Sequence, residues 1–171
     1  MRHAAVTLRP ARGEDAPFLR GLYASTREEE LLALDWSATQ RETFLSLQFE
    51  AQDRHYRAHY PQAQFDVIER EGAPVGRLVV DRRDDVIHVL DISLLPAQRG
   101  TGLGSALLRE LQEEAAVRGS VIVLHVARTN PALRLYARLG FRVLHEEAIY
   151  VGMEWRPGTL ASFEAQPKTA S

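Results

Sequence analysis

The feature that most constrains this chain is a glycine-rich loop between an expected strand and an expected helix. The loop reads Gln-Arg-Gly-Thr-Gly-Leu-Gly-Ser over residues 98–105. An almost wholly apolar run over 86–95 predicts a buried strand before it, and an amphipathic pattern over 105–117 predicts a helix after it. Alternating glycines let a backbone turn sharply and approach a ligand closely. Because a helix start also offers unpaired N–H groups, the loop predicts a phosphate or pyrophosphate site.

Two common phosphate-binding loops do not match this segment. A Walker loop needs Lys followed by Ser or Thr after its last glycine, whereas Ser105 follows Gly104 directly. A dinucleotide fingerprint needs a glycine at position 105. The remaining alternative is a plain strand-to-helix connection without a ligand. Three glycines are a poor choice for a plain connection, because each one loses much conformational entropy when the chain folds.

Two segments together resemble the GNAT N-acetyltransferase superfamily. Arg99-x-x-Gly102-x-Gly104 matches the Q/R-x-x-G-x-G/A signature of that family. The segment from Asn130 to Phe141 is similar to its N-x-A-x-x-L-Y-x-x-x-G-F segment. The resemblance extends from about Asp66 to Trp155. It agrees with the order of the expected elements, which predicts an α/β fold with one mixed central sheet and helices on both faces.

Length and composition favour one ordinary globular domain. The chain has 171 residues, of which 45% are hydrophobic and 26% charged. We expect a single GNAT-like domain over residues 1–156 and a flexible C-terminal tail over 157–171. Within the domain, Asp15 is expected to cap a helix to about Tyr23, followed by an irregular or partly helical segment over 25–36. A long helix should then run from a capping box at 37–40 to about residue 59.

The resemblance implies that acetyl-coenzyme A is the acetyl donor. Backbone amides of the loop would hold the coenzyme A pyrophosphate, and backbone groups at the end of the preceding strand would pair with pantetheine. The implied coenzyme-binding residues are Ile92, Ser93, Leu94, Arg99, Gly100, Thr101, Gly102, Leu103, Gly104, Ser105 and Asn130. The side chains of Ile92 and Leu94 are expected to pack in the core, and the implied role concerns their backbone. For Arg99 the alternative is a solvated side chain. Asn130 and Pro131 also form a typical helix start.

Three residues are candidates for proton transfer. Tyr136 matches the tyrosine of the second motif, which implies a general acid that protonates the departing thiolate; the alternative is an amphipathic core tyrosine. An alkyl amine with a pKa of about 10.4 is less than about 0.1% neutral at pH 7, so an amine acceptor must lose a proton. His125 and Asp91, on two expected strands, are candidates for that base. For both, the alternative is a polar residue at the edge of the core.

Several classes of function are excluded or disfavoured by composition. The absence of cysteine rules out a disulfide framework and a covalent thiol intermediate. A net charge of −2 gives no broad basic field for nucleic acid. No apolar run is long enough for a membrane span or a signal peptide, so we expect a cytoplasmic protein. His55 and His59 are four residues apart but have no third ligand, and no metal is expected.

These features predict an enzyme that moves an acetyl group from acetyl-coenzyme A directly to a primary amine. The amine belongs either to a small molecule or to a protein. The competing hypothesis is a non-catalytic module that binds acyl-coenzyme A as a sensor or a structural element. The acceptor pocket is expected from residues 20–60, where the resemblance is weakest, and the sequence leaves a homodimer open.

Overall fold

The chain forms a mixed α/β structure around a seven-stranded sheet, as the sequence predicts. The computed structural model describes residues 5–158, so most of the expected tail, 159–171, lies outside the described residues. The strand order is β1-β2-β3-β4-β5-β7-β6. The strands are β1 Val6–Pro10, β2 Gln64–Arg70, β3 Ala73–Arg82, β4 Val86–Leu94, β5 Val121–Ala127, β6 Arg142–Glu146 and β7 Tyr150–Trp155. The helices are α1 Ala16–Leu32, α2 Ala38–His59, α3 Leu103–Arg118 and α4 Ala132–Arg138, with short 3₁₀ turns at Gly13–Asp15 and Pro96–Gln98.

The described residues separate into two compact units. The first contains residues 5–81 and 90–104, and therefore includes α1, α2, the end of β4 and most of the glycine loop. The second contains residues 82–89 and 105–158, with β5 to β7, α4 and nearly all of α3. The candidate site residues are divided between the two units.

Strands β1, β2 and β3 form an antiparallel meander in the first unit. A two-residue turn, Glu71 and Gly72, joins β2 to β3, and both residues have positive φ angles, 53° and 80°. Paired positive φ values match the right-handed twist of the flanking strands. The turn is confined to these two residues, because Ala73 and Pro74 already belong to β3.

Helix α1 is longer than the sequence analysis predicts. It continues without interruption to Leu32, through most of the segment that was expected to be irregular or partly helical. No glycine or proline breaks residues 22–33, and the side chains of Arg27 and Glu30 form an i,i+3 ion pair at 2.9 Å. Good helix formers and local ion pairing therefore outweigh the repulsion among the three consecutive glutamates.

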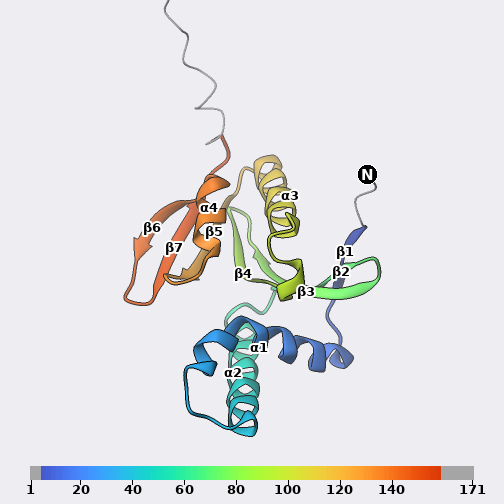
Figure 1. Cartoon of the computed structure of the whole chain (residues 1–171). Helices are drawn as coiled ribbons and strands as arrows, with labels where there is room; N and C mark the ends of the chain where they lie inside the picture. The colour runs from blue at the N-terminus through green and yellow to red at the C-terminus, as the bar shows by residue number, and fades with distance from the viewer. Residues whose placement is uncertain (1–4, 159–171) are drawn as a thin grey trace, which may run out of the picture. The chain divides into compact units, whose positions relative to one another are not determined.

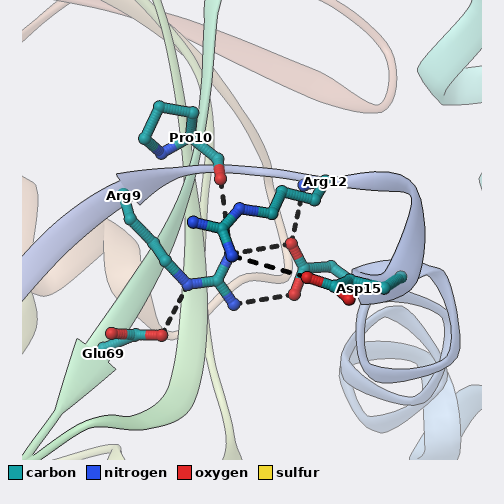
Figure 2. Close-up of polar contacts among 6 residues, drawn as sticks. Arg9, Pro10, Arg12, Asp15 and Glu69 are labelled. Carbon is teal, nitrogen blue, oxygen red and sulfur yellow. Dashed lines mark hydrogen bonds and ion pairs between the residues drawn. The ribbon is translucent and has the colours of Figure 1, made fainter.

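Asp15 fixes the start of α1 by binding an arginine rather than by capping the helix. Its carboxylate accepts hydrogen bonds from Arg9 Nη1 and Nη2 at 2.8 and 2.7 Å and from the backbone N–H of Arg12 at 2.7 Å (Figure 2). Arg9 also donates to Glu69 on the neighbouring strand at 2.5 Å. These direct bonds lower the pKa of Asp15 to about 2. The cluster ties α1 to β1 and β2.

Helices α1 and α2 lie side by side in the first unit (Figure 1). The expected capping box at the start of α2 is confirmed, since Ser37 and Gln40 exchange side-chain and backbone hydrogen bonds at 3.1 and 2.8 Å. The rings of Tyr23 on α1 and Phe49 on α2 are 5.8 Å apart. Phe49 is buried with Leu19 and Val67, so one small core joins both helices to β2.

The second unit is built on the parallel pair of β4 and β5. Their register runs from Val86 opposite Val121 to Val89 opposite Leu124. One side of α3 is buried, and it includes Leu107, Leu108, Leu111 and Ala115. Strands β6 and β7 form an antiparallel hairpin. Among residues 5–158, no helix combines the length and the apolar character that a membrane crossing requires.

Candidate functional site

The glycine loop has the backbone conformation that its sequence predicts. Gly100 and Gly102 have φ angles of 72° and 85°, in the left-handed region that favours glycine. A Cβ atom built at either position would meet no heavy atom within 4 Å, so the backbone there faces open space. Helix α3 begins at Leu103, two residues earlier than expected, and Gly104 is therefore part of its first turn. The first-turn N–H groups of a helix lack partners within the helix, and an anion can bind them.

Side chains from the first unit hold the loop in place. Arg99 donates from Nε to the carbonyl of Leu94 at 3.1 Å, and its Nη2 lies 3.4 Å from the hydroxyl of Ser25 on α1. Thr101 donates to the carbonyl of Gln98 at 2.6 Å, and Gln98 in turn accepts from Arg70 on β2 at 2.9 Å. The Arg99 guanidinium is thus engaged with protein oxygen atoms, while the loop backbone stays exposed.

The end of β4 approaches β3 very closely. A Cβ atom at Gly76 of β3 would clash with the carbonyl oxygen of Ser93 and would lie 2.8 Å from Leu94 Cδ2. Next to this contact, the hydroxyl of Tyr56 on α2 donates to the carbonyl of Leu90 at 2.9 Å. Ile92, Ser93 and Leu94 are each only half-buried. The side chains of Ile92 and Leu94 are therefore less completely packed than the sequence analysis expects.

Asp91 lies in the same stretch of β4, and its surroundings shift the pKa of its carboxyl group. Burial raises its pKa, while Arg77 and a hydrogen bond from the Ser93 hydroxyl at 2.7 Å act in the opposite direction. The nearest Arg77 nitrogen is 3.8 Å from the carboxylate, beyond hydrogen-bond distance. The Asp91 side chain keeps 20% of its surface exposed. A carboxylate with a raised pKa that solvent can still reach is suited to accept a proton.

Arg77 is a buried charge that the sequence analysis did not identify. Its side chain is 4% exposed, and it pairs with Asp53 on α2 at 3.0 Å. The guanidinium also lies over the rings of Phe49 and Phe65, at 5.3 and 5.6 Å from the ring centroids. A signal was present, because Arg77 interrupts the apolar run of β3. A charge in a strand that is otherwise buried needs a partner, but the sequence does not say which one.

His125 lies in the second unit, on an exposed position of β5. Its ring is 5.7 Å from the ring of His88 on β4 and 5.3 Å from that of His145 on β6. His145 reaches His125 across β7 because Gly152, which pairs with His125, has no side chain in the way. The three imidazoles form a row, yet in the described part of the chain no group of three or more His, Cys, Asp or Glu residues is arranged to hold a metal ion.

Tyr136 and Asn130 occupy the α4 region of the second unit. Tyr136 is 6% exposed and packs edge-on against Phe141, with ring centroids 5.7 Å apart. The Asn130 side chain accepts a hydrogen bond from the N–H of Ala132 at 2.9 Å, as expected of a helix start. Gly140 ends the helix with a φ angle of 91°. The motif residues thus shape a short helix that presents Tyr136 from its buried side.

The structure therefore divides the sequence-predicted residues into two groups. The first unit brings together Asp91, Ile92, Ser93, Leu94, Arg99, Gly100, Thr101, Gly102, Leu103 and Gly104. The second unit holds Ser105, His125, Asn130 and Tyr136. Tyr56 and Asp53 on α2 are additional residues of the first group, and their polar contacts with β3 and β4 become visible only in the folded chain.

Known proteins share both the sequence pattern and the fold. The family model described as Acetyltransferase (GNAT) family matches residues 28–141. PaiA N-acetyltransferase from Thermoplasma acidophilum, solved in complex with coenzyme A, is 16% identical with a TM-score of 0.67, over 89% of this chain and 99% of that one. A structure described as histone acetyltransferase HPA2 and related acetyltransferase, from Corynebacterium glutamicum, is 23% identical with a TM-score of 0.61, over 96% and 99%.

The ribosomal-protein-S18-alanine N-acetyltransferase from Escherichia coli is also similar, at 18% identity and a TM-score of 0.57 over 98% of this chain and 99% of that one. At these identities the likeness shows a shared fold, and the family model carries the assignment. Because that model spans most of the chain and includes the glycine loop and the whole second motif, the protein belongs to the GNAT acetyltransferase family.

Proposed function

We propose that this protein is an N-acetyltransferase that moves an acetyl group from acetyl-coenzyme A directly to a primary amine. The observation that carries the proposal is the glycine loop. Its backbone is open at Gly100 and Gly102, and it leads directly into the first turn of α3. Family membership and the coenzyme A complex of the Thermoplasma neighbour support the same donor.

In this proposal, the loop binds the pyrophosphate of coenzyme A through backbone N–H groups from Gly100 to Ser105. The helix dipole of α3 adds a positive potential at the same place. Backbone groups of Ile92 to Leu94 would pair with the pantetheine chain, and an N–H there would polarise the thioester carbonyl. Pro96 has no N–H, so such a donor must precede it. Asn130 shapes the start of α4, and we assign it a role in the coenzyme site only through that helix.

The transfer needs one proton removed and one proton delivered. The amine nitrogen attacks the thioester carbonyl, so a C–N bond forms and the C–S bond breaks. We assign the removal of the amine proton to Asp91, directly or through water. Burial raises the pKa of this carboxyl group, and Asp91 lies on β4, the strand that precedes the glycine loop. His125 is the second candidate, since its ring is exposed.

The departing sulfur needs a proton, and Tyr136 is the proposed donor. Its position in the second motif supports this role, and the packing of its ring against Phe141 would hold the hydroxyl in a fixed orientation. The acceptor would be recognised by α1 and α2. A small-molecule amine and a protein amine both remain compatible with these helices.

The competing function, a non-catalytic acyl-coenzyme A sensor, differs in one measurable respect. An enzyme releases coenzyme A thiol in the presence of a suitable amine, whereas a sensor binds the thioester and leaves it intact. A panel of polyamines, amino acids, aminoglycosides and peptide N-termini, followed by thiol detection, separates the two functions. Raised thiol release with at least one amine is the expected result.

The loop assignment is tested with Gly102→Val. The new side chain forces a positive φ angle on a branched residue and fills the open space at the backbone. We expect the affinity for acetyl-coenzyme A to fall at least about tenfold, or about 1.4 kcal/mol, by calorimetric titration. Gly72→Val is the matched control, because Gly72 has a similar φ angle and equally open space in the β2–β3 turn. Equal affinities for both folded variants would remove the loop from the coenzyme site.

A further inference from the structure

Two carboxylates, those of Asp53 and Asp91, lie at different distances from the buried guanidinium of Arg77. Arg77 Nη2 is 3.0 Å from Asp53 Oδ1, a hydrogen-bonded ion pair. Arg77 Nη1 is 3.8 Å from Asp91 Oδ2, too far for a hydrogen bond. Asp53 comes from α2, 24 residues before Arg77 in the sequence. Arg77 is thus bound directly by Asp53 on α2, and not by Asp91, the proposed base.

We propose that Asp53 is a positioning residue, which holds the charge of Arg77 away from Asp91 and so leaves Asp91 able to accept a proton. The inference rests on the proposed function, in which Asp91 is the base. In the folded protein, the proton affinity of Asp91 should therefore depend on the charge of Asp53, and this dependence can be measured without any reaction.

The physical argument starts from what a free arginine does to a carboxylate. A guanidinium that binds directly stabilises the charged form, and the pKa of the carboxyl group falls. An Asp91 carboxylate bound in this way would be a weak base at neutral pH. In the structure, Asp53 neutralises the guanidinium and also adds a negative charge near Asp91. Both effects favour the protonated form of Asp91.

Other contacts keep this arrangement in place. The rings of Phe49 and Phe65 fix the plane of the Arg77 guanidinium. Arg57 binds the second oxygen of Asp53 at 2.8 Å and thereby fixes the orientation of that carboxylate. Movement of Arg77 toward Asp91 would break the 3.0 Å ion pair and leave Asp53 with Arg57 alone. The unequal distances are therefore a property of the cluster rather than of a single side chain.

The groups that face Asp91 within the first unit are few. Arg77 faces it from β3, and the Ser93 hydroxyl binds it from β4 itself. From α2, Asp53 and Arg57 lie behind Arg77. Of these groups, Asp53 can lose its charge with little change in shape, because Asn has nearly the same size.

The test is an NMR titration of the side-chain carboxyl carbons in the full-length protein. The Asp91 signal is assigned by its loss in Asp91→Asn, and its pKa is then compared between the wild type and Asp53→Asn. We expect the pKa of Asp91 to fall by at least about half a unit, roughly a threefold loss of proton affinity. Glu50→Gln is the matched control. It removes another α2 carboxylate, which is half-exposed and pairs loosely with Arg20 at 3.8 Å, and it should leave Asp91 unchanged.

The outcomes separate this inference from the proposed function. An unchanged Asp91 titration in folded Asp53→Asn, or an equal shift in Glu50→Gln, overturns the role of Asp53. A lowered pKa of Asp91 supports it even if Asp91→Asn proves fully active; in that case only the assignment of Asp91 as the base fails. If both hold, the acid limb of the rate profile of Asp53→Asn should move to lower pH with the Asp91 signal. Asp53→Ser removes the same charge and replaces Asp53→Asn if that variant does not fold.

Discussion

Two aspartates in the first unit each lie beside an arginine, and their pKa values are shifted in opposite directions. Asp15 receives both terminal nitrogens of Arg9, at 2.8 and 2.7 Å, and its pKa falls to about 2. Asp91 has Arg77 beside it at 3.8 Å, and its pKa is raised because burial outweighs that more distant charge. A neighbouring arginine therefore does not by itself predict the protonation of a carboxyl group. Direct hydrogen bonds from Arg9 dominate at Asp15, whereas burial dominates at Asp91.

Each of the two arginines lies within 4 Å of two carboxylates. Arg9 binds Asp15 and Glu69 directly, at the junction of β1, β2 and α1. Arg77 binds Asp53 directly and leaves Asp91 at a longer distance. The first cluster fastens elements of the fold together. The second leaves one carboxylate incompletely neutralised, next to the strand end and loop that we assign to the coenzyme.

The largest expected effect is on turnover, in Asp91→Asn. The amide keeps the shape of the side chain but cannot accept the amine proton, and we expect kcat/KM to fall about 10³-fold. Because burial raises the pKa of Asp91, the active, charged form is lost as the pH falls through that pKa. The wild type should therefore show an acid limb in its pH–rate profile that Asp91→Asn lacks.

His125→Ala provides the contrast for that experiment. Its exposed ring lies in the second unit, in the row of three imidazoles. We expect its kcat/KM to stay within about threefold of the wild type, with the acid limb intact. Loss of the limb in His125→Ala, together with its survival in Asp91→Asn, would reverse the assignment of the base.

A smaller effect is expected for the group that returns a proton. Tyr136→Phe keeps the ring packed against Phe141 and removes only the hydroxyl. We expect kcat to fall about 10²-fold, with nearly unchanged affinity for acetyl-coenzyme A. Steady-state rates and calorimetric titration of the same preparation measure both quantities. A kcat within twofold of the wild type would make Tyr136 a packing residue and leave the proton donor unassigned.

The smallest effect is on stability, in Asp15→Asn. The variant loses charge-assisted bonds to Arg9, and we expect Tm to fall by roughly 5 °C at pH 7. Since the folded pKa of Asp15 is about 2, below its usual value, the wild-type advantage is complete above about pH 4 and disappears as the pH falls toward 2. Glu14→Gln is the control, because Glu14 is exposed and pairs only with Arg12 at 3.4 Å. Similar losses of Tm in the two variants would contradict the structural role of the Arg9 cluster.

Features set by neighbouring residues could be predicted from the sequence. The glycine loop, the Ser37–Gln40 capping box and the Asn130 helix start each depend on contacts within a few residues, and the structure contains all three. The resemblance to the GNAT family then allowed the mixed central sheet to be predicted as well. Helix α1 continues to Leu32, beyond the end expected near Tyr23, because helix propensity and the Arg27–Glu30 pair keep the segment helical.

The polar cluster around Arg77 could not be predicted in the same way. Its contacts join α2, β3 and β4, and only the folded chain decides which carboxylate reaches the guanidinium directly. The sequence also left the surroundings of His125 undecided. The neighbour of its ring, His145, depends on the pairing of β5 with β7, because Gly152 opposite His125 leaves space for the His145 ring. Tertiary packing determines which residues become neighbours here, and the local sequence pattern does not predict it.

The contact between Gly76 and the carbonyl of Ser93 has a consequence for how this enzyme can change. Even the methyl group of alanine has no room at position 76, because Ser93, Leu94 and Ile68 Cδ1, at 3.1 Å, surround it. Any substitution must move β3 or the strand end that leads into the loop that we assign to the coenzyme. Gly76 is therefore a position at which sequence change is restricted by the backbone of the neighbouring strand, although Gly76 has no side chain of its own.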